Sequence, residues 1–121
     1  MKLRQIMIFV SDLTEAKRFY CEVLGFGLAD ETETRLAFEH DGCPFVAYLC
    51  EAAVEVHNYS RESRSVFVFE VASLDEQMTA LREAGVAVLH DAPSENDQGR
   101  YAAFADPFGN VHEIWEPRVT S

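Results

Sequence analysis

The sequence lacks long hydrophobic runs, and it contains little cysteine. Among its 121 residues no apolar stretch approaches the length needed to cross a bilayer, which excludes a membrane-spanning helix. No signal peptide is recognisable before the first predicted strand, so we expect a cytoplasmic protein. The three cysteines are odd in number and have no CxxC spacing, and they therefore indicate neither a disulfide framework nor a zinc knuckle.

Basic residues are also scarce, with 10 Lys and Arg against 21 Asp and Glu and a formal net charge of −11. A surface this acidic repels phosphate backbones and anionic lipid, so we expect neither nucleic acid nor a membrane as a partner. It attracts cations, including basic small molecules; alternatively, the charge serves only to keep the protein soluble. The sequence has no glycine-rich phosphate loop and no Ser-His-Asp or Cys-His arrangement for nucleophilic catalysis.

The secondary-structure elements that the sequence does predict occur twice in the same order. The first half contains a strand, a helix and three strands, at residues 3–10, 12–24, 26–31, 34–39 and 45–50. The second half repeats this order, at residues 65–72, 74–84, 86–89, 99–105 and 111–116. Hydrophobic residues crowd the first strand so densely that we expect it to be buried on both faces.

Both predicted helices have the same start and stop signals. Each begins with a capping box, in which a side-chain acceptor precedes an acid by three residues: Asp12 with Glu15, and Ser73 with Glu76. Each ends at a glycine, Gly25 or Gly85. The repeated order therefore predicts one α+β domain made of two tandem modules.

We place the two βαβββ modules at residues 1–50 and 64–121 of a single domain spanning 1–121, with a polar linker at 51–63. Each module has one helix, which covers one face of its sheet. The uncovered faces would curve toward one another as a mixed sheet around a cleft. The two modules that face each other can belong to one chain or to two.

A turn near the C-terminus orients one carboxylate of special interest. Asp106 and Gly109 predict a tight turn. In the strand that follows, Ile114 marks the core side, so Glu113 and Trp115 share the other face. A carboxylate in the middle of a sheet beside a tryptophan needs a partner or a function, unless it is simply an exposed residue of a solvated face.

Strand parity predicts the side chains that line the cleft. They are Gln5, Met7, Phe9, Val46, Tyr48, Cys50, Val66, Val68, Glu70, Val111, Glu113 and Trp115. This apolar and aromatic set with a few polar groups is typical of a small-molecule pocket, although it also suits a core or a dimer interface. If Glu70 and Glu113 are buried together they repel one another, and a cationic ligand or a metal would relieve the repulsion.

The histidines are predicted to lie outside this cleft. His40 is next to a turn and His90 is in a loop before Pro93, so we expect both to be solvated. His112 has the opposite parity to Glu113, which predicts that it packs near the second helix.

Three stretches, residues 10–13, 19–26 and 104–115, resemble the vicinal oxygen chelate superfamily. That group contains glyoxalases, extradiol dioxygenases, and fosfomycin and bleomycin resistance proteins. The resemblance implies a ligand cleft lined by sheets of paired modules, commonly in a homodimer. From the cleft lining that strand parity predicts, we expect the ligand-binding residues to be Gln5, Met7, Phe9, Tyr48, Val66, Glu70, Glu113 and Trp115.

In metal-dependent members of the superfamily, one metal ligand lies on the first and on the last strand of each module. The resemblance carries these positions onto Gln5, Tyr48, Val66 and Glu113. Valine cannot bind a metal, and the oxygens of Gln5 and Glu113 alone are too few for an octahedral site. We therefore expect no metal and no other cofactor; a divalent metal held by Gln5 and Glu113, with Glu70 or His57 as substitutes, is the alternative.

Two functions from different classes follow. The first is a metal-free binding protein of the bleomycin-resistance type, which holds a small amphipathic or basic molecule by aromatic stacking and by attraction to carboxylates. The second is a metal-dependent lyase, isomerase or dioxygenase that acts on vicinal-oxygen substrates, in which Gln5 and Glu113 would hold the ion. Its catalytic residue stays unknown, with Glu113 as the one candidate. Whether the protein is an enzyme stays open at this point.

Overall fold

The computed structural model describes residues 1–63 and 65–118. The chain divides into two units, Met1–Val54 and Glu55–Ser121. The first unit contains β1 (Ile6–Val10), α1 (Leu13–Lys17), the π-helical segment η1 (Arg18–Val23), β2 (Leu28–Glu31), β3 (Arg35–Phe38) and β4 (Phe45–Leu49). The second contains α2 (Tyr59–Glu62), β5 (Phe67–Glu70), α3 (Leu74–Glu83), β6 (Ala87–Val88), β7 (Ser94–Glu95), β8 (Gly99–Ala105) and β9 (Val111–Pro117).

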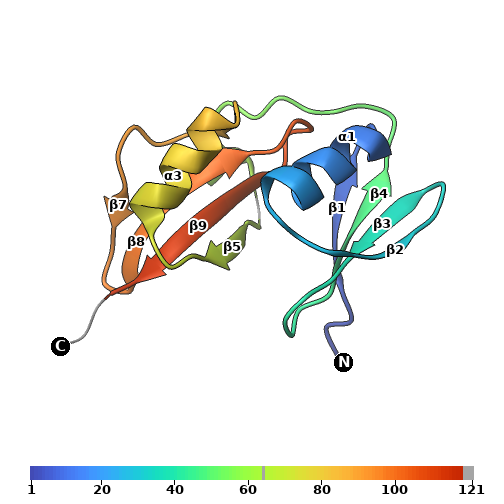
Figure 1. Ribbon diagram of the computed structural model, residues 1–121, viewed down its shortest axis with the longest axis horizontal. Coiled ribbons are helices and arrows are strands. Elements are labelled where there is room, and N and C mark those ends of the chain that lie inside the picture. Colours follow the sequence, from blue (N-terminus) through green and yellow to red (C-terminus); the bar gives the residue numbers. More distant parts are fainter. Residues whose placement is uncertain (64, 119–121) are drawn as a thin grey trace. The chain divides into compact units, whose positions relative to one another are not determined.

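Each unit builds one mixed sheet, and the two sheets have equivalent strand orders (Figure 1). The order is β1-β4-β3-β2 in the first sheet and β5-β9-β8-β6 in the second, where the short strand β7 pairs with β8 as well. In both, the first strand of the unit pairs in parallel with the last, and the remaining pairs are antiparallel. The predicted α+β class is confirmed, and the equal order is what two tandem βαβββ modules require.

The first helix begins and ends at the predicted signals. The Asp12 carboxylate accepts a hydrogen bond from the Glu15 N–H at 3.0 Å, and Gly25 ends the helical segment with φ of +86°. Part of the predicted helix is π-helical, because the Leu24 N–H reaches back to the Phe19 carbonyl, five residues earlier. Phe19 and Tyr20 are buried, and Tyr20 packs beside Phe38 of the first sheet.

Strand β1 corrects one prediction. Ile8 and Val10 are buried, whereas Met7 and Phe9 are 44% and 53% exposed. The strand is therefore buried on one face within the described chain, and not on both as expected. The residues that precede it are not in a strand, and Leu3 is exposed.

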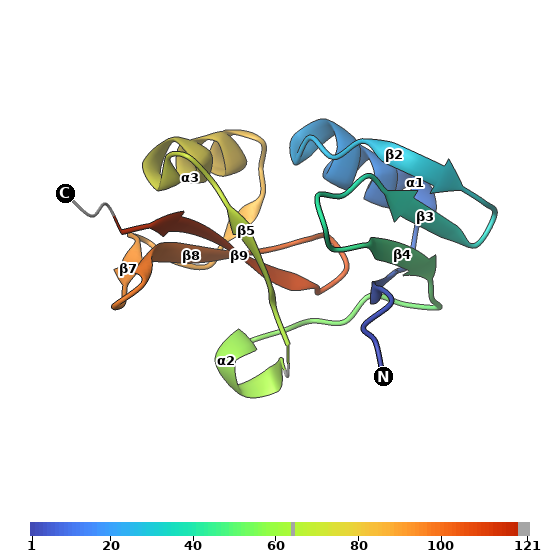
Figure 2. The ribbon, with the colours of Figure 1, turned by 90° about the horizontal axis from the view of Figure 1, so that it is seen from below.

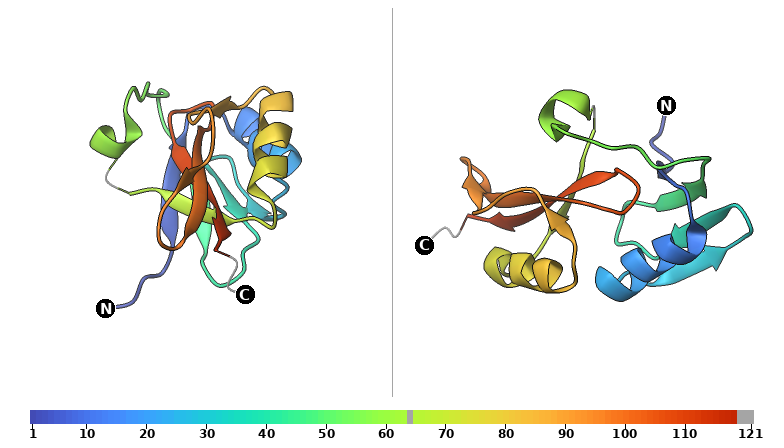
Figure 3. Two further views of the ribbon diagram at one scale, coloured as in Figure 1. Left: turned by 90° about the vertical axis from the view of Figure 1, so that its left-hand side faces the viewer. Right: turned by 90° about the horizontal axis from the view of Figure 1, so that it is seen from above.

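Helix α3 covers one face of the second sheet. The Ser73 hydroxyl caps it by accepting from the Glu76 N–H at 3.3 Å, and three apolar residues of one stripe, Leu74, Met78 and Leu81, are buried. Seen from below and from above, α2 lies on the opposite side of this sheet from α3 (Figures 2 and 3).

The segment predicted as a linker is partly structured. Residues 51–63 contain α2, whose first residue, Tyr59, bonds to the second sheet. The structure also adds β7, which no pattern predicted, and shortens the predicted strand at 86–89 to Ala87–Val88. The predicted bounds of the C-terminal module, 64 and 121, lie outside the described residues.

No helix in the described part of the chain combines the length and the hydrophobicity that crossing a membrane needs.

Candidate functional site: the open face of the second sheet

Glu113 lies on the central strand of the second sheet, on the face away from α3. The register pairs it with Val68 of β5 and Ala103 of β8. The next row joins Trp115 to its neighbours on the same two strands, Glu70 and Tyr101. We call this surface the open face; its residues are Val68, Glu70, Tyr101, Ala103, Glu113 and Trp115. Its direction follows from the alternate residues of β9, His112 and Ile114, which are only 1% and 3% exposed.

The carboxylate of Glu113 is already engaged by a residue of the predicted linker. The Tyr59 hydroxyl donates a hydrogen bond of 2.9 Å to Glu113 Oε2, and both side chains are partly buried. The two residues are 54 positions apart in the sequence. Helix α2 thus presents one phenol to the middle of the open face.

The environment keeps this phenol protonated. Burial raises the pKa of the Tyr59 hydroxyl above its ordinary value, and the hydrogen bond to the Glu113 carboxylate raises it further. Tyr59 therefore acts toward Glu113 as a neutral hydrogen-bond donor. It does not neutralise the carboxylate charge.

His90 also contributes to the open face, contrary to the prediction that it is solvated. Strands β6 and β7 both pair with β8, and they leave a gap between them at residues 89–93. In this gap the His90 imidazole replaces a strand carbonyl, because its Nδ1 accepts a hydrogen bond of 2.9 Å from the Ala103 N–H. A ring nitrogen that accepts carries no proton, so in the neutral ring the proton is on Nε2.

The rings around His90 form a short aromatic row. Its ring meets Tyr59 edge-on, with centroids 6.3 Å apart, and meets Tyr101 in the same way at 5.8 Å. The other two histidine predictions are confirmed: His40 is exposed, and His112 is packed on the α3 side among Phe67, Phe69 and Phe104.

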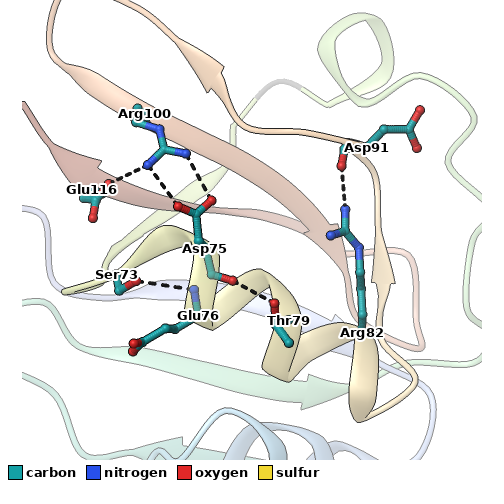
Figure 4. Close-up of polar contacts among 8 residues, drawn as sticks. All are labelled: Ser73, Asp75, Glu76, Thr79, Arg82, Asp91, Arg100 and Glu116. Carbon is teal, nitrogen blue, oxygen red and sulfur yellow. Dashed lines mark hydrogen bonds and ion pairs between the residues drawn. The ribbon is translucent and has the colours of Figure 1, made fainter.

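The His90 loop is fixed from the last turn of α3. Arg82 Nη2 donates to the carbonyl of His90 at 2.7 Å and to that of Asp91 at 3.0 Å, and the second of these bonds is drawn in Figure 4. A planar guanidinium with several donors suits two neighbouring carbonyls. Both acceptors are backbone carbonyls, so Arg82 acts through the backbone of the loop.

We predict that Arg82→Met loosens this loop. Without the guanidinium the His90–Ala103 bond opens more often, and the Ala103 amide is expected to exchange with solvent about fivefold faster, a modest change because Arg82 is exposed. Hydrogen exchange followed by NMR measures this. Glu83→Met, a change to the same side chain at the next exposed position of α3, serves as the control. Equal Ala103 exchange in Arg82→Met and in the unchanged protein would contradict the assignment.

A second arginine ties the opposite end of α3 to the sheet. Arg100 of β8 contacts the Asp75 carboxylate at 3.1 Å and the Glu116 carboxylate at 3.2 Å (Figure 4). Hydrogen bonding to Asp75 raises the pKa of the guanidinium further above its ordinary value. These ion pairs lie on the α3 side of the sheet and do not involve the open-face residues.

Trp115 is held against a glycine. A Cβ built on Gly99 would come within 2.8 Å of the indole nitrogen of Trp115 and still closer to the backbone oxygen of Glu116. Gly99 is itself buried. The indole thus lies over a part of β8 where only hydrogen fits, and it flanks the row that also contains Tyr101.

The remaining residues predicted for the site divide between the two units. In the first unit the parallel register places Met7 beside Val46 and Phe9 beside Tyr48, and Gln5 comes just before β1, half-buried. In the second unit Val66 precedes β5 and is half-buried. Glu70 is exposed and only Glu113 is partly buried, so the condition for strong repulsion between these two carboxylates is not met.

A metal at the family positions does not fit these residues. Val66, one of the four positions that the resemblance implies, has no atom that can bind a metal. Within residues 1–63 and 65–118, no group of three or more His, Cys, Asp and Glu side chains is arranged to hold a metal ion.

A shallow hollow of about 330 Å³ lies along α3, lined by Asp75, Glu76, Thr79, Ala80 and Glu83. It belongs to the surface of the helix, on the side of the sheet away from Glu113. Its rim is acidic, and Asp75 is paired with Arg100.

The fold agrees with the comparisons with known proteins. The chain belongs to the Glyoxalase/Bleomycin resistance protein/Dioxygenase superfamily, whose model matches residues 2–114. This confirms the resemblance found in the sequence. The superfamily often uses a divalent metal. The comparison with curated proteins gives no match.

Three solved structures illustrate the range of relatives. TnmS3, an antibiotic binding protein from Streptomyces sp. CB03234, is 27% identical over 98% of this chain and 99% of its own, with a TM-score of 0.66. The fosfomycin resistance protein FosX from Listeria monocytogenes is 17% identical over 98% and 95%, with a TM-score of 0.76. A lactoylglutathione lyase from Agrobacterium tumefaciens is 18% identical over 95% and 92%, with a TM-score of 0.69. The last two show the shared fold alone.

Proposed function

We propose that the protein binds a small aromatic cation on the open face of its second sheet, as a metal-free binding protein. The observation that carries the proposal is the surroundings of Glu113. Its carboxylate is partly buried and lies among aromatic side chains, with Tyr59 bonded to it and Trp115 two positions along its own strand.

This arrangement suits a cation with a flat ring system. A half-buried carboxylate attracts a cation more strongly than a fully solvated one, because water screens the pair less. The rings of Tyr101 and Trp115, adjacent in the register, offer faces on which an aromatic ligand stacks and to which positive charge is attracted. The net charge of −11 raises the local concentration of cations.

Two further observations support binding without a metal. The metal positions that the resemblance implies include position 66, where the chain has valine, which cannot bind a metal. TnmS3, a relative of similar length, is an antibiotic binding protein. These points support a ligand-holding protein and give no support to the lyase, isomerase or dioxygenase alternative.

The test uses proflavine, a planar aromatic cation, and the fluorescence of Trp115, which is the single tryptophan of the chain. Proflavine is expected to quench Trp115 with a saturable curve. Glu113→Gln, which removes the charge and keeps the shape, is expected to weaken binding about tenfold, a typical loss for one charged partner in a partly buried pair.

Glu70→Gln is the matched control, since it makes the same change at an exposed position of the same face. We expect it to weaken binding about twofold or less, because solvent screens its charge. Equal affinities of Glu113→Gln and the unchanged protein, or a complete absence of quenching, would count against the proposal.

A further inference from the structure

The Glu113 carboxylate at the proposed site already has a hydrogen-bond partner within the chain. Tyr59 donates to the Glu113 carboxylate at 2.9 Å, and it comes from α2, which lies on the opposite side of the sheet from α3 (Figure 3). We propose that Tyr59 is an internal competitor, so that a cation binding to Glu113 displaces the phenol and releases α2 from the open face. The inference rests on the proposed function and adds a gate to it.

The bond with Tyr59 is of a kind that a cation replaces. Tyr59 is a neutral donor, because burial and the bond to Glu113 both hold its hydroxyl proton in place. A cation adds full charge to the hydrogen bond, which makes the new contact stronger than a neutral one. The measured affinity is therefore the intrinsic affinity multiplied by the fraction of molecules in which Tyr59 does not occupy the carboxylate.

Helix α2 is built to move as one piece. The Glu62 carboxylate accepts hydrogen bonds from the backbone N–H groups of His57 and Asn58, both at 3.1 Å, and the Ser63 N–H bonds to the Tyr59 carbonyl. These contacts are internal to residues 57–63. They keep the turn folded when the phenol leaves Glu113.

The first experiment needs no ligand. Val68 is the register neighbour of Glu113 on β5 and is 55% exposed, so Val68→Lys places an ammonium group on the open face beside the carboxylate. In protein labelled with ¹³Cζ-tyrosine, the Tyr59 signal is identified by its loss in Tyr59→Phe. We expect Val68→Lys to move this signal toward the position of an unbonded tyrosine, and we expect amide exchange at 57–63 to increase.

Val68→Met is the matched control, because it has a similar length without the charge. It is expected to leave the Tyr59 signal in place. An unchanged Tyr59 signal in Val68→Lys overturns the proposal, and so does an equal shift in Val68→Met, which would indicate a packing effect and not displacement by charge.

The second experiment measures the competition directly. Tyr59→Phe removes the hydroxyl and keeps the ring, so proflavine is expected to bind about tenfold more tightly, because one hydrogen bond to a charged group no longer has to be broken. In a Glu113→Gln background the same substitution is expected to have no effect on affinity, which completes a double-mutant cycle.

The two ideas fail in different ways. If proflavine binds with dependence on Glu113 and Tyr59→Phe binds no more tightly, the gate is wrong and the proposed function stands. If proflavine does not bind and Val68→Lys still displaces the Tyr59 signal, the gate stands and the proposed ligand class is wrong.

Discussion

Replacing Asp106 by alanine is expected to lower the free energy of unfolding by about 3 kcal/mol, because three hydrogen bonds of the β8–β9 turn end on its carboxylate. Oδ1 accepts from the N–H of Phe108 at 2.9 Å and of Asn110 at 2.8 Å, and Oδ2 accepts from the Asn110 side chain at 2.8 Å. Asp106 is only 5% exposed, so water replaces few of these bonds. Urea unfolding followed by Trp115 fluorescence measures the change.

Two variants separate the cause. Asp106→Asn keeps Oδ1 as an acceptor for both backbone N–H groups, and it is expected to cost about 1 kcal/mol. Asp97→Ala makes the alanine substitution at an exposed position of the same unit, where we expect a change within about 0.5 kcal/mol. If Asp106→Ala is no less stable than Asp97→Ala, the carboxylate does not hold this turn.

The turn matters for function because it joins the two strands that contribute most of the open face. Tyr101 and Ala103 are on β8, and Glu113 and Trp115 are on β9. Gly109 adopts a φ of +95°, a conformation that residues other than glycine rarely adopt. Asp106 and Gly109, which predict the turn from the sequence, therefore also help to set the register of the two strands that form the candidate site.

Local patterns predicted these features well. The helices start at Asp12 and Ser73 because each side chain accepts a hydrogen bond from the backbone N–H three residues later. The two partners are close in the sequence, so the pattern is recognisable there. Strand parity likewise depends only on alternation. It correctly placed Glu113 opposite His112, and the register confirms that Glu113 and Trp115 share their face with β5 and β8 residues.

The features that the sequence left hidden depend on contacts between distant residues. Tyr59 meets Glu113 across 54 positions, from a segment that has no apolar period and therefore reads as a linker. His90 fills a gap in a β-ladder with its side chain, and no pattern distinguishes such a histidine from one in an ordinary loop. Both residues would have been found only by asking what satisfies the Glu113 carboxylate and the Ala103 N–H.

The wrong prediction that β1 is buried on both faces has a different cause. Its residues are apolar on both parities, and apolar character alone does not tell a strand buried on two faces from one whose second face is free. Met7 and Phe9 are exposed because α1 covers only the other face of the first sheet. Composition shows that burial of these side chains would be favourable, and it does not show whether another part of the protein buries them.

Stability should fall in mild acid because of His112. The ring is 1% exposed among Phe67, Phe69 and Phe104, and burial lowers its pKa from 6.5 to about 4. In the unfolded chain the group has its ordinary pKa of 6.5. Above pH 6.5 both states are neutral; below it the unfolded state takes up a proton that the folded state refuses. Stability is therefore expected to drop by roughly 3 kcal/mol between pH 6.5 and 4, and to level off below.

The contribution of His112 is isolated by comparing the protein with His112→Phe at each pH, because all other titrating groups are shared. We expect the difference in free energy of unfolding between the two proteins to change by roughly 3 kcal/mol from pH 7 to pH 4, in the direction that favours the variant at low pH. The absolute cost of the substitution does not enter this comparison. A difference that stays constant from pH 7 to pH 4 would mean that the imidazole is protonated as easily in the folded protein as in the unfolded one, and that the aromatic cluster does not exclude its charge.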